Sequence, residues 1–141
     1  MAFNVLIVDD SASMRTVIKR SIEMSGFDVG QFLDAGNGRE ALAVLEKEWA
    51  DIILTDIHMP EMDGIAFLKA LQEQTVVSST PVVIVTTEGR EERLDELLAL
   101  GAKVYIKKPF KPEEIRKVLL NVLGMDEDAM QDKEALEGSN F

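Results

Sequence analysis

Charged and hydroxyl side chains directly follow four of the chain's apolar segments, at the points where strands would end. The carboxyl ends of parallel strands meet at one edge of an open α/β sheet, and ligands bind in the crevice beyond that edge. Side chains far apart in the sequence are therefore expected to meet there. A group of carboxylates with one hydroxyl and one ammonium can hold a hard divalent cation and can stabilise a phosphoryl group carried by an aspartate. These side chains, with the segments they follow, are Asp9 and Asp10 (3–8), Asp56 (52–55), Thr86 (82–85) and Lys108 (104–107).

The three aspartates are candidate ligands of a metal ion. Three like charges close together are unfavourable without a counter-ion. Mg²⁺ suits them, because it prefers oxygen ligands in octahedral geometry at about 2.0–2.1 Å and retains several waters. We expect Asp10 and Asp56 to bind Mg²⁺ directly and Asp9 to bind it directly or through water, with Mn²⁺ as the alternative ion. The competing interpretation is that each aspartate caps a helix at a strand–helix junction, but three of them at neighbouring strand ends disfavour it.

Asp56 is the preferred nucleophile of the three, because it follows the third and central apolar segment. A phosphoryl group on this side chain would add roughly 1.5 to 2 negative charges. The metal ion and Lys108 would neutralise that charge, and Thr86 would donate a hydrogen bond. Backbone amides of residues 57–59 could supply further donors. These residues together predict phosphorylation of an aspartate side chain.

Strand-like and helix-like patterns alternate along the chain. The first, third and fourth apolar segments are rich in valine and isoleucine and are apolar on both faces, as expected for central strands covered by helices. Residues 28–33 form a weaker candidate that is better suited to a sheet edge. Apolar residues at helical spacing fill the intervals, so five strand–helix pairs are expected. Right-handed crossovers then place helices on both sides, which predicts an α/β fold with a doubly wound, five-stranded parallel sheet.

Residues that favour helix ends agree with this division. Ser11 or Ser13 is expected to cap the first helix and Asp63 the third, since short polar side chains accept hydrogen bonds from the first free amides of a helix. Gly101 is expected to end the fourth helix, and Pro112 suits the first turn of the fifth.

Two further features are interpreted as structural. Trp49 is expected to pack at the end of the second helix, and the charged run 90–93 to form a solvated helix face.

Length, charge and composition limit the classes of function. The 141 residues fit one domain of residues 1–124, followed by an acidic C-terminal tail of residues 125–141. The net charge of −11 argues against non-specific binding to nucleic acid or to anionic membrane surfaces. The absence of cysteine excludes thiolate metal sites and cysteine nucleophiles. No apolar run approaches the roughly 20 residues of a membrane span, and the start lacks the pattern of a signal peptide, so we expect a cytoplasmic protein without membrane insertion.

Four motifs occur in order at the predicted strand ends. They are LIVDDS (6–11), DIHMPEMDG (56–64), VTT (85–87) and KKPF (107–110). In order and spacing they resemble the receiver domain of two-component response regulators, above all its stand-alone CheY-like members. The resemblance covers about residues 3–123. It implies the flavodoxin-like, CheY-like strand order 2-1-3-4-5.

The resemblance also implies a role for each site residue. A histidine kinase would phosphorylate the chain in a reaction that depends on Mg²⁺. The protein would then be a phosphoacceptor that assists its own phosphorylation and dephosphorylation, and not an enzyme that acts on other molecules. The implied roles are phosphoacceptor for Asp56, metal ligands for Asp9, Asp10, Asp56 and the backbone carbonyl of His58, and phosphoryl contacts for Thr86 and Lys108.

The same resemblance implies how phosphorylation acts at a distance. Thr86 would move toward the phosphoryl group, and Tyr105, the switch aromatic, would turn into the space left behind. The surface formed by the fourth helix, fifth strand and fifth helix would then change its affinity for a downstream protein, most simply in chemotaxis or motility. The chain itself would be a monomer or a weak dimer. His58 and Glu88 each lie two residues after a site residue and are expected to tune the phosphoryl lifetime by orienting water, blocking it or pairing with each other.

Other functions fit the motifs less well. A phosphorelay intermediate or a phosphate sink has the same minimal form as a chemotaxis regulator and stays open. An aspartyl-phosphate phosphatase of the haloacid dehalogenase type would need an aspartate two residues after the nucleophile, where His58 stands, and usually a cap domain. A flavodoxin-like cofactor binder would need a hydroxyl-rich phosphate loop, which nothing in the sequence resembles. We expect no DNA-binding or catalytic effector domain after residue 124, because the remaining segment is too short for one.

Overall fold

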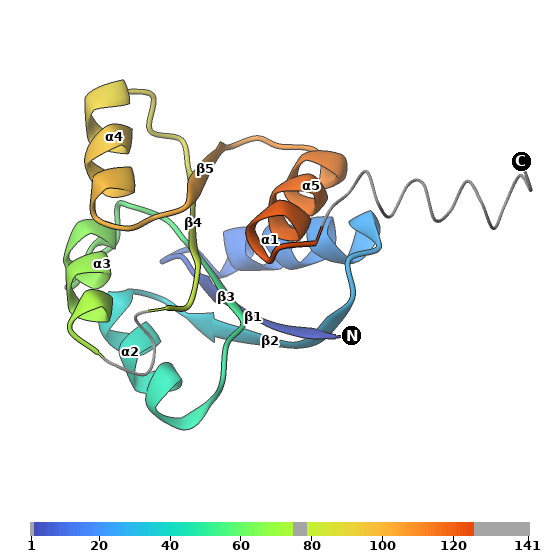
Figure 1. Cartoon of the computed structure of the whole chain (residues 1–141), viewed down its shortest axis with the longest axis horizontal. Coiled ribbons are helices and arrows are strands. Elements are labelled where there is room, and N and C mark those ends of the chain that lie inside the picture. Colours follow the sequence, from blue (N-terminus) through green and yellow to red (C-terminus); the bar gives the residue numbers. More distant parts are fainter. Residues whose placement is uncertain (1, 75–78, 126–141) are drawn as a thin grey trace, which may run out of the picture.

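Five parallel strands form a single sheet in the order β2-β1-β3-β4-β5, with helices on both faces (Figure 1). The computed structural model describes residues 2–74 and 79–125. The predicted doubly wound α/β fold and its strand order are therefore confirmed. The elements are β1 (Phe3–Val8), α1 (Ala12–Ser25), β2 (Val29–Ala35), α2 (Gly38–Lys47), β3 (Ile52–Thr55), α3 (Gly64–Gln72), β4 (Val82–Thr86), α4 (Glu91–Ala99), β5 (Val104–Lys107) and α5 (Pro112–Val122).

The sheet separates two hydrophobic layers. Helices α1 and α5 cover one face, and α2, α3 and α4 cover the other (Figure 1). Successive side chains of a strand point to opposite faces. In β1, Leu6 and Val8 accordingly belong to the layer with α3, while Val5 and Ile7 belong to the layer with α1. All four are buried, which explains why β1 carries no polar side chain between Asn4 and the strand end at Val8.

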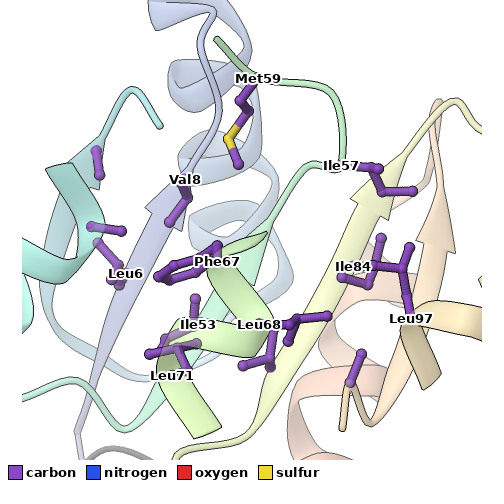
Figure 2. Packing of buried hydrophobic residues seen from close by; sticks show 14 of the residues in the cluster. Leu6, Val8, Ile53, Ile57, Met59, Phe67, Leu68, Leu71, Ile84 and Leu97 are labelled. Atoms are coloured by element: carbon purple, nitrogen blue, oxygen red, sulfur yellow. The ribbon is translucent and has the colours of Figure 1, made fainter. Parts of the chain in front are cut away.

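Helix α3 anchors the layer that lies beneath β1 and β3. Phe67 is fully buried and points from α3 toward Val8 of β1 and Ile53 of β3, and Leu71 follows it one turn later (Figure 2). Burial of a side chain of this size contributes about 1.5–3 kcal/mol to folding. Because the packing joins α3 to both central strands, it also fixes the strand ends that carry the polar residues.

The helix ends follow the capping chemistry of the sequence. Ser11, rather than Ser13, caps α1, and its hydroxyl accepts a hydrogen bond from the amide of Met14. Asp63 caps α3 in the same way, accepting from the Ala66 amide at 2.9 Å. Pro112 occupies the first turn of α5, where its missing amide is not needed.

Two expectations need correction. The edge strand β2 runs over Val29–Ala35 and not over 28–33, because its last residues find partners on β1, as the pairing of Ile7 with Asp34 shows. Trp49 is not a packing residue: 58% of it is exposed, and its indole nitrogen donates to Asp51.

The ends of the described chain bear on two further expectations. Met125 packs against the layer formed with α1 and α5, whereas residues 126–141 of the predicted tail lie outside the described residues. Among the helices described, none has the length and apolar character needed to cross a bilayer.

Candidate functional site

The carboxyl edge of the sheet brings together four charged side chains from three strand ends. Asp9 and Asp10 follow β1, Asp56 follows β3 and Lys108 follows β5. One ligand oxygen from each of the three aspartates lies within 4.8 Å of the others. The Lys108 ammonium lies 2.9 Å from Oδ2 of Asp9 and 3.4 Å from Oδ2 of Asp56. The structure thus places these residues as the sequence predicted, at one point of the molecule.

Hydrogen bonds that continue beyond the strands set the positions of these residues. The Asp9 amide donates to the carbonyl of Ala35, at the end of β2, at 3.1 Å. The Asp56 amide donates to the carbonyl of Val8 at 2.9 Å. At the same edge, beyond β4 and β5, the Lys108 amide donates to the Thr86 carbonyl at 2.9 Å. The peptide bond between Lys108 and Pro109 is cis.

The two adjacent aspartates occupy different environments. Asp9 is buried, and its two carboxylate oxygens accept hydrogen bonds from the Ser11 amide and the Lys108 ammonium, both at 2.9 Å. A buried carboxylate needs such partners to offset the loss of water. Asp10 is exposed, and its carboxylate accepts no hydrogen bond from the described part of the chain. Asp9 is thus held rigidly by its side chain, while Asp10 is available to an ion from solvent.

The backbone around Asp56 is tightly packed against the start of α3. One carboxylate oxygen of Asp56 accepts from the amide of Ile57 at 2.7 Å, while the other faces Lys108. Gly64 approaches so closely that a Cβ there would lie 2.8 Å from the Asp56 carbonyl oxygen and 2.9 Å from Cα of Ile57. Any larger residue would therefore displace the strand end that presents the Asp56 carboxylate.

Thr86 and Tyr105 lie on neighbouring strands near the site. Thr86 is fully buried at the end of β4, and its hydroxyl accepts a hydrogen bond from the Glu88 amide at 3.1 Å. Tyr105 is partly buried and packs against the layer that contains α2, α3 and α4. It pairs with Ile84 across the β4–β5 ladder, two residues before Thr86. Tyr105 therefore lies beside the strand that carries Thr86, at the pair next to it on the same face of the sheet.

The rim of the site is closed by contacts between two loops. Nε2 of His58, after β3, lies 3.3 Å from Oε1 of Glu88, after β4. Glu88 is only 7% exposed in its side chain, against 58% for His58. Its carboxylate also accepts from Nε and Nη2 of Arg90 at 2.9 and 2.8 Å. These hydrogen bonds from Arg90, foremost the side-chain ones, hold the pKa of Glu88 well below its usual value.

Two arginines near the site were not identified from the sequence. Arg90 was assigned to a solvated helix face, but α4 begins at Glu91, so Arg90 precedes the helix and turns back to Glu88. Arg15, in α1, donates from Nη1 to the backbone carbonyl of Asp9. Neither lies in one of the four motifs, and no periodicity marks them. Arg90 meets Glu88 across a local turn, whereas Arg15 also meets Asp34 of β2, which only the tertiary fold brings close.

The set of donor atoms fits a hard divalent cation. Carboxylate oxygens are the ligands that Mg²⁺ prefers, and Asp10 leaves the cluster open to solvent, as an ion that keeps part of its water shell requires. The Lys108 ammonium adds a positive charge of the protein itself to that of a bound cation, beside the carboxylates of Asp9 and Asp56. Together, a bound cation and Lys108 can neutralise a group that carries more negative charge than a single carboxylate.

Known proteins of one family resemble this chain along most of its length. The family model for the response regulator receiver domain matches residues 5–120. A chemotaxis protein CheY homolog of Campylobacter jejuni is 37% identical over 121 residues, covering 85% of this chain and 92% of that protein. The chemotaxis response regulator CheY4 of Vibrio cholerae has a similar structure, with a TM-score of 0.76 at 38% identity over 86% of this chain and 99% of that chain. A chain of the CheX-CheY-BeF3-Mg+2 complex from Borrelia burgdorferi gives a TM-score of 0.75 at 31% identity, and the match covers 85% of this chain and 88% of that chain.

Proposed function

This chain belongs to the response regulator receiver domain family, and we propose that it is a phosphorylation switch of a two-component system whose phosphoacceptor is Asp56. A histidine kinase is the phosphodonor in this proposal. The observation that carries it is the position of the Asp56 carboxylate, 3.4 Å from the Lys108 ammonium and beside two further carboxylates. This combination serves an aspartate that must gain negative charge.

The chemistry is transfer of a phosphoryl group from a phosphohistidine to a carboxylate oxygen of Asp56. The new bond joins this oxygen to phosphorus, and the bond between phosphorus and the histidine nitrogen breaks. Lys108 neutralises charge on the acyl phosphate, and Thr86 donates a hydrogen bond to it after its hydroxyl turns. The chain assists this transfer and the later hydrolysis, but acts on no other substrate.

Magnesium is the proposed cofactor, with Mn²⁺ as a substitute. Asp9, Asp10, Asp56 and the backbone carbonyl of His58 would hold it. A bound Mg²⁺ supplies charge neutralisation for the phosphoryl oxygens and orients them. The Borrelia complex, which contains Mg²⁺ and beryllofluoride with a CheY protein, supports this assignment.

The output is a change in partner binding at the surface of α4, β5 and α5. Thr86 is buried at the end of β4, so movement of its hydroxyl toward the phosphoryl group would alter the loop to α4. Tyr105 lies on the adjacent strand within that surface and would turn with it. Two states of this surface, one favoured by the phosphoryl group, are sufficient for signalling.

Chemotaxis or motility is the proposed biological role, supported by the Campylobacter and Vibrio relatives. The cytoplasm is the proposed location, and a monomer or weak dimer is the proposed state. His58 and Glu88 would set the phosphoryl lifetime, since their contact closes the rim of the site. A role as a phosphorelay intermediate or phosphate sink would use the same site without the downstream target.

Intact-mass spectrometry after incubation with acetyl phosphate and Mg²⁺ tests the proposal. The wild-type chain should gain one phosphoryl group, and the gain should disappear with EDTA or in Asp56→Asn. Asp63→Asn is the matched control, because asparagine still caps α3 and Asp63 lies outside the metal cluster. It should be phosphorylated like the wild type. Equal phosphorylation of Asp56→Asn would show that the phosphoacceptor is another residue.

A further inference from the structure

Asp10 depends on the backbone for its position. Its carboxylate has no hydrogen-bond partner within the described residues, although one of its oxygens lies within 4.8 Å of those of Asp9 and Asp56. Asp9 is anchored through its own side chain, whereas Asp10 has no such restraint. An unrestrained ligand loses conformational entropy when it binds an ion, which weakens binding. The backbone that carries Asp10 is therefore the place to look for a restraint.

Arg15 supplies a contact at that position. From the first turns of α1, its Nη1 atom donates to the backbone carbonyl oxygen of Asp9. The Asp9 carbonyl and the Asp10 amide belong to one planar peptide unit. A donor held on the carbonyl therefore limits rotation of the whole unit and sets the direction in which the Asp10 side chain leaves the chain.

Arg15 is in turn held by the sheet. Its Nε atom donates to Oδ2 of Asp34 at 3.0 Å, and Lys19 pairs with the other oxygen of this carboxylate. Asp34 lies on β2 opposite Ile7 of β1, two residues before Asp9. The guanidinium is thus fixed at two of its nitrogens, one on the edge strand and one on the end of β1. Its rigid planar fork makes both contacts at once, which the single ammonium of a lysine cannot reproduce.

We infer that Arg15, oriented by Asp34, is a positioning residue that fixes the Asp9–Asp10 peptide unit and so preorganises Asp10 as a metal ligand. The inference rests on the proposed function, because it concerns the same Mg²⁺ site. Partners of metal ligands commonly change metal affinity about 10-fold or more when they are removed.

Charge and geometry make opposite predictions for Arg15, which allows a clear test. As a nearby positive charge, Arg15 would oppose binding of a cation, so Arg15→Ala would tighten Mg²⁺ binding. As a positioning residue, it would favour binding, so Arg15→Ala would weaken it. Arg15→Lys keeps the charge and loses the fork, and Asp34→Asn keeps Arg15 but weakens its anchor.

The experiment is calorimetric titration of Mg²⁺ into the full chain. We expect the dissociation constant to rise about 10-fold in Arg15→Ala and Arg15→Lys, and by a smaller factor in Asp34→Asn. Arg20→Lys is the control and should stay within about twofold of the wild type, because this exposed arginine of the same helix has no partner among the described residues. In acetyl phosphate reactions the half-saturating Mg²⁺ concentration should rise by the same factor, while the rate at saturating Mg²⁺ should not change. A merely structural role would lower the urea midpoint without moving the Mg²⁺ dependence.

The outcomes separate this inference from the proposed function. Tighter or unchanged Mg²⁺ binding in both Arg15 variants, with normal binding by the wild type, would overturn the inference alone. Failure of the wild-type chain to bind Mg²⁺ would overturn the proposed metal site together with the inference.

Discussion

Replacing Gly64 with alanine should damage both the stability of the fold and the phosphoacceptor. The new Cβ would lie 2.8 Å from the carbonyl oxygen of Asp56 and 2.9 Å from Cα of Ile57. Ordinary contacts begin at 3.4 Å, so the backbone of α3 or of the strand end must retreat by about 0.6 Å. Neither neighbour is the flexible end of a side chain, and the Gly64 amide also donates to the Ile57 carbonyl at 2.8 Å.

The size of the effect follows from this clash. Overpacking that moves backbone in a packed region costs about 1–3 kcal/mol. For a chain of this size, 1 kcal/mol lowers the melting temperature by about 4 °C, so a decrease of about 4–12 °C is expected. Because the displaced atoms belong to the phosphoacceptor and its neighbour, phosphorylation by acetyl phosphate should also slow at a temperature where the variant is folded.

Thermal and urea denaturation of the full chain measure the effect. Gly89→Ala is the matched control, since a Cβ there meets nothing within 4 Å and its φ is not positive. Its stability should lie within about 1 kcal/mol of the wild type, or slightly above it because alanine restricts the unfolded chain. If Gly64→Ala melts within about 2 °C of the wild type, the close approach of α3 to Asp56 does not constrain the protein as we argue.

Three further predictions concern the rim and the switch. In Arg90→Ala the pKa of Glu88 should rise toward its ordinary value of 4.5, as carbon NMR can follow. Because the folded-state pKa of Glu88 is depressed, the contacts of its ionised carboxylate stabilise the fold above about pH 4.5 and are lost as the pH falls through the folded-state pKa. The difference in stability between the wild type and Arg90→Ala should therefore be full at pH 7 and should shrink in acid. Thr86→Ala should keep phosphorylation at Asp56 but weaken phosphate-dependent partner binding, measured with beryllofluoride, and undiminished coupling would contradict the switch. His58→Ala should change the rate of dephosphorylation several-fold while leaving Mg²⁺ affinity unchanged, and identical decay curves would assign His58 a passive place on the surface.

The fold was predictable because its signals are local and repeated. Val5, Leu6, Ile7 and Val8 are apolar without interruption, as expected for a strand buried on both faces, and the structure buries each of them. Capping at Asp63 was equally readable, since the residue type and the following helix pattern occur side by side. The expectation failed at Trp49, because nothing in the sequence shows that the indole stays at the surface, where it donates a hydrogen bond to Asp51.

The sequence by itself determined which charged side chains meet at the candidate site. It places Asp9, Asp10, Asp56 and Lys108 at strand ends, and parallel strands with right-handed crossovers must bring such ends to one edge. Residue type and position within an element are sufficient for this conclusion, so the distances between these side chains only made it quantitative.

Tertiary structure alone decided how the site is held and closed. Arg15 links the Asp9 carbonyl to Asp34 of β2 only because α1 packs beside the edge strand. His58 meets Glu88 only because the loops after β3 and β4 lie side by side, which no pattern in the chain specifies. An arginine side chain is long and can turn to many partners, so its choice depends on which carbonyl or carboxylate the fold leaves within reach. The backbone pattern sets where a strand ends, but the partner of a long, polar side chain is selected by the whole packed molecule.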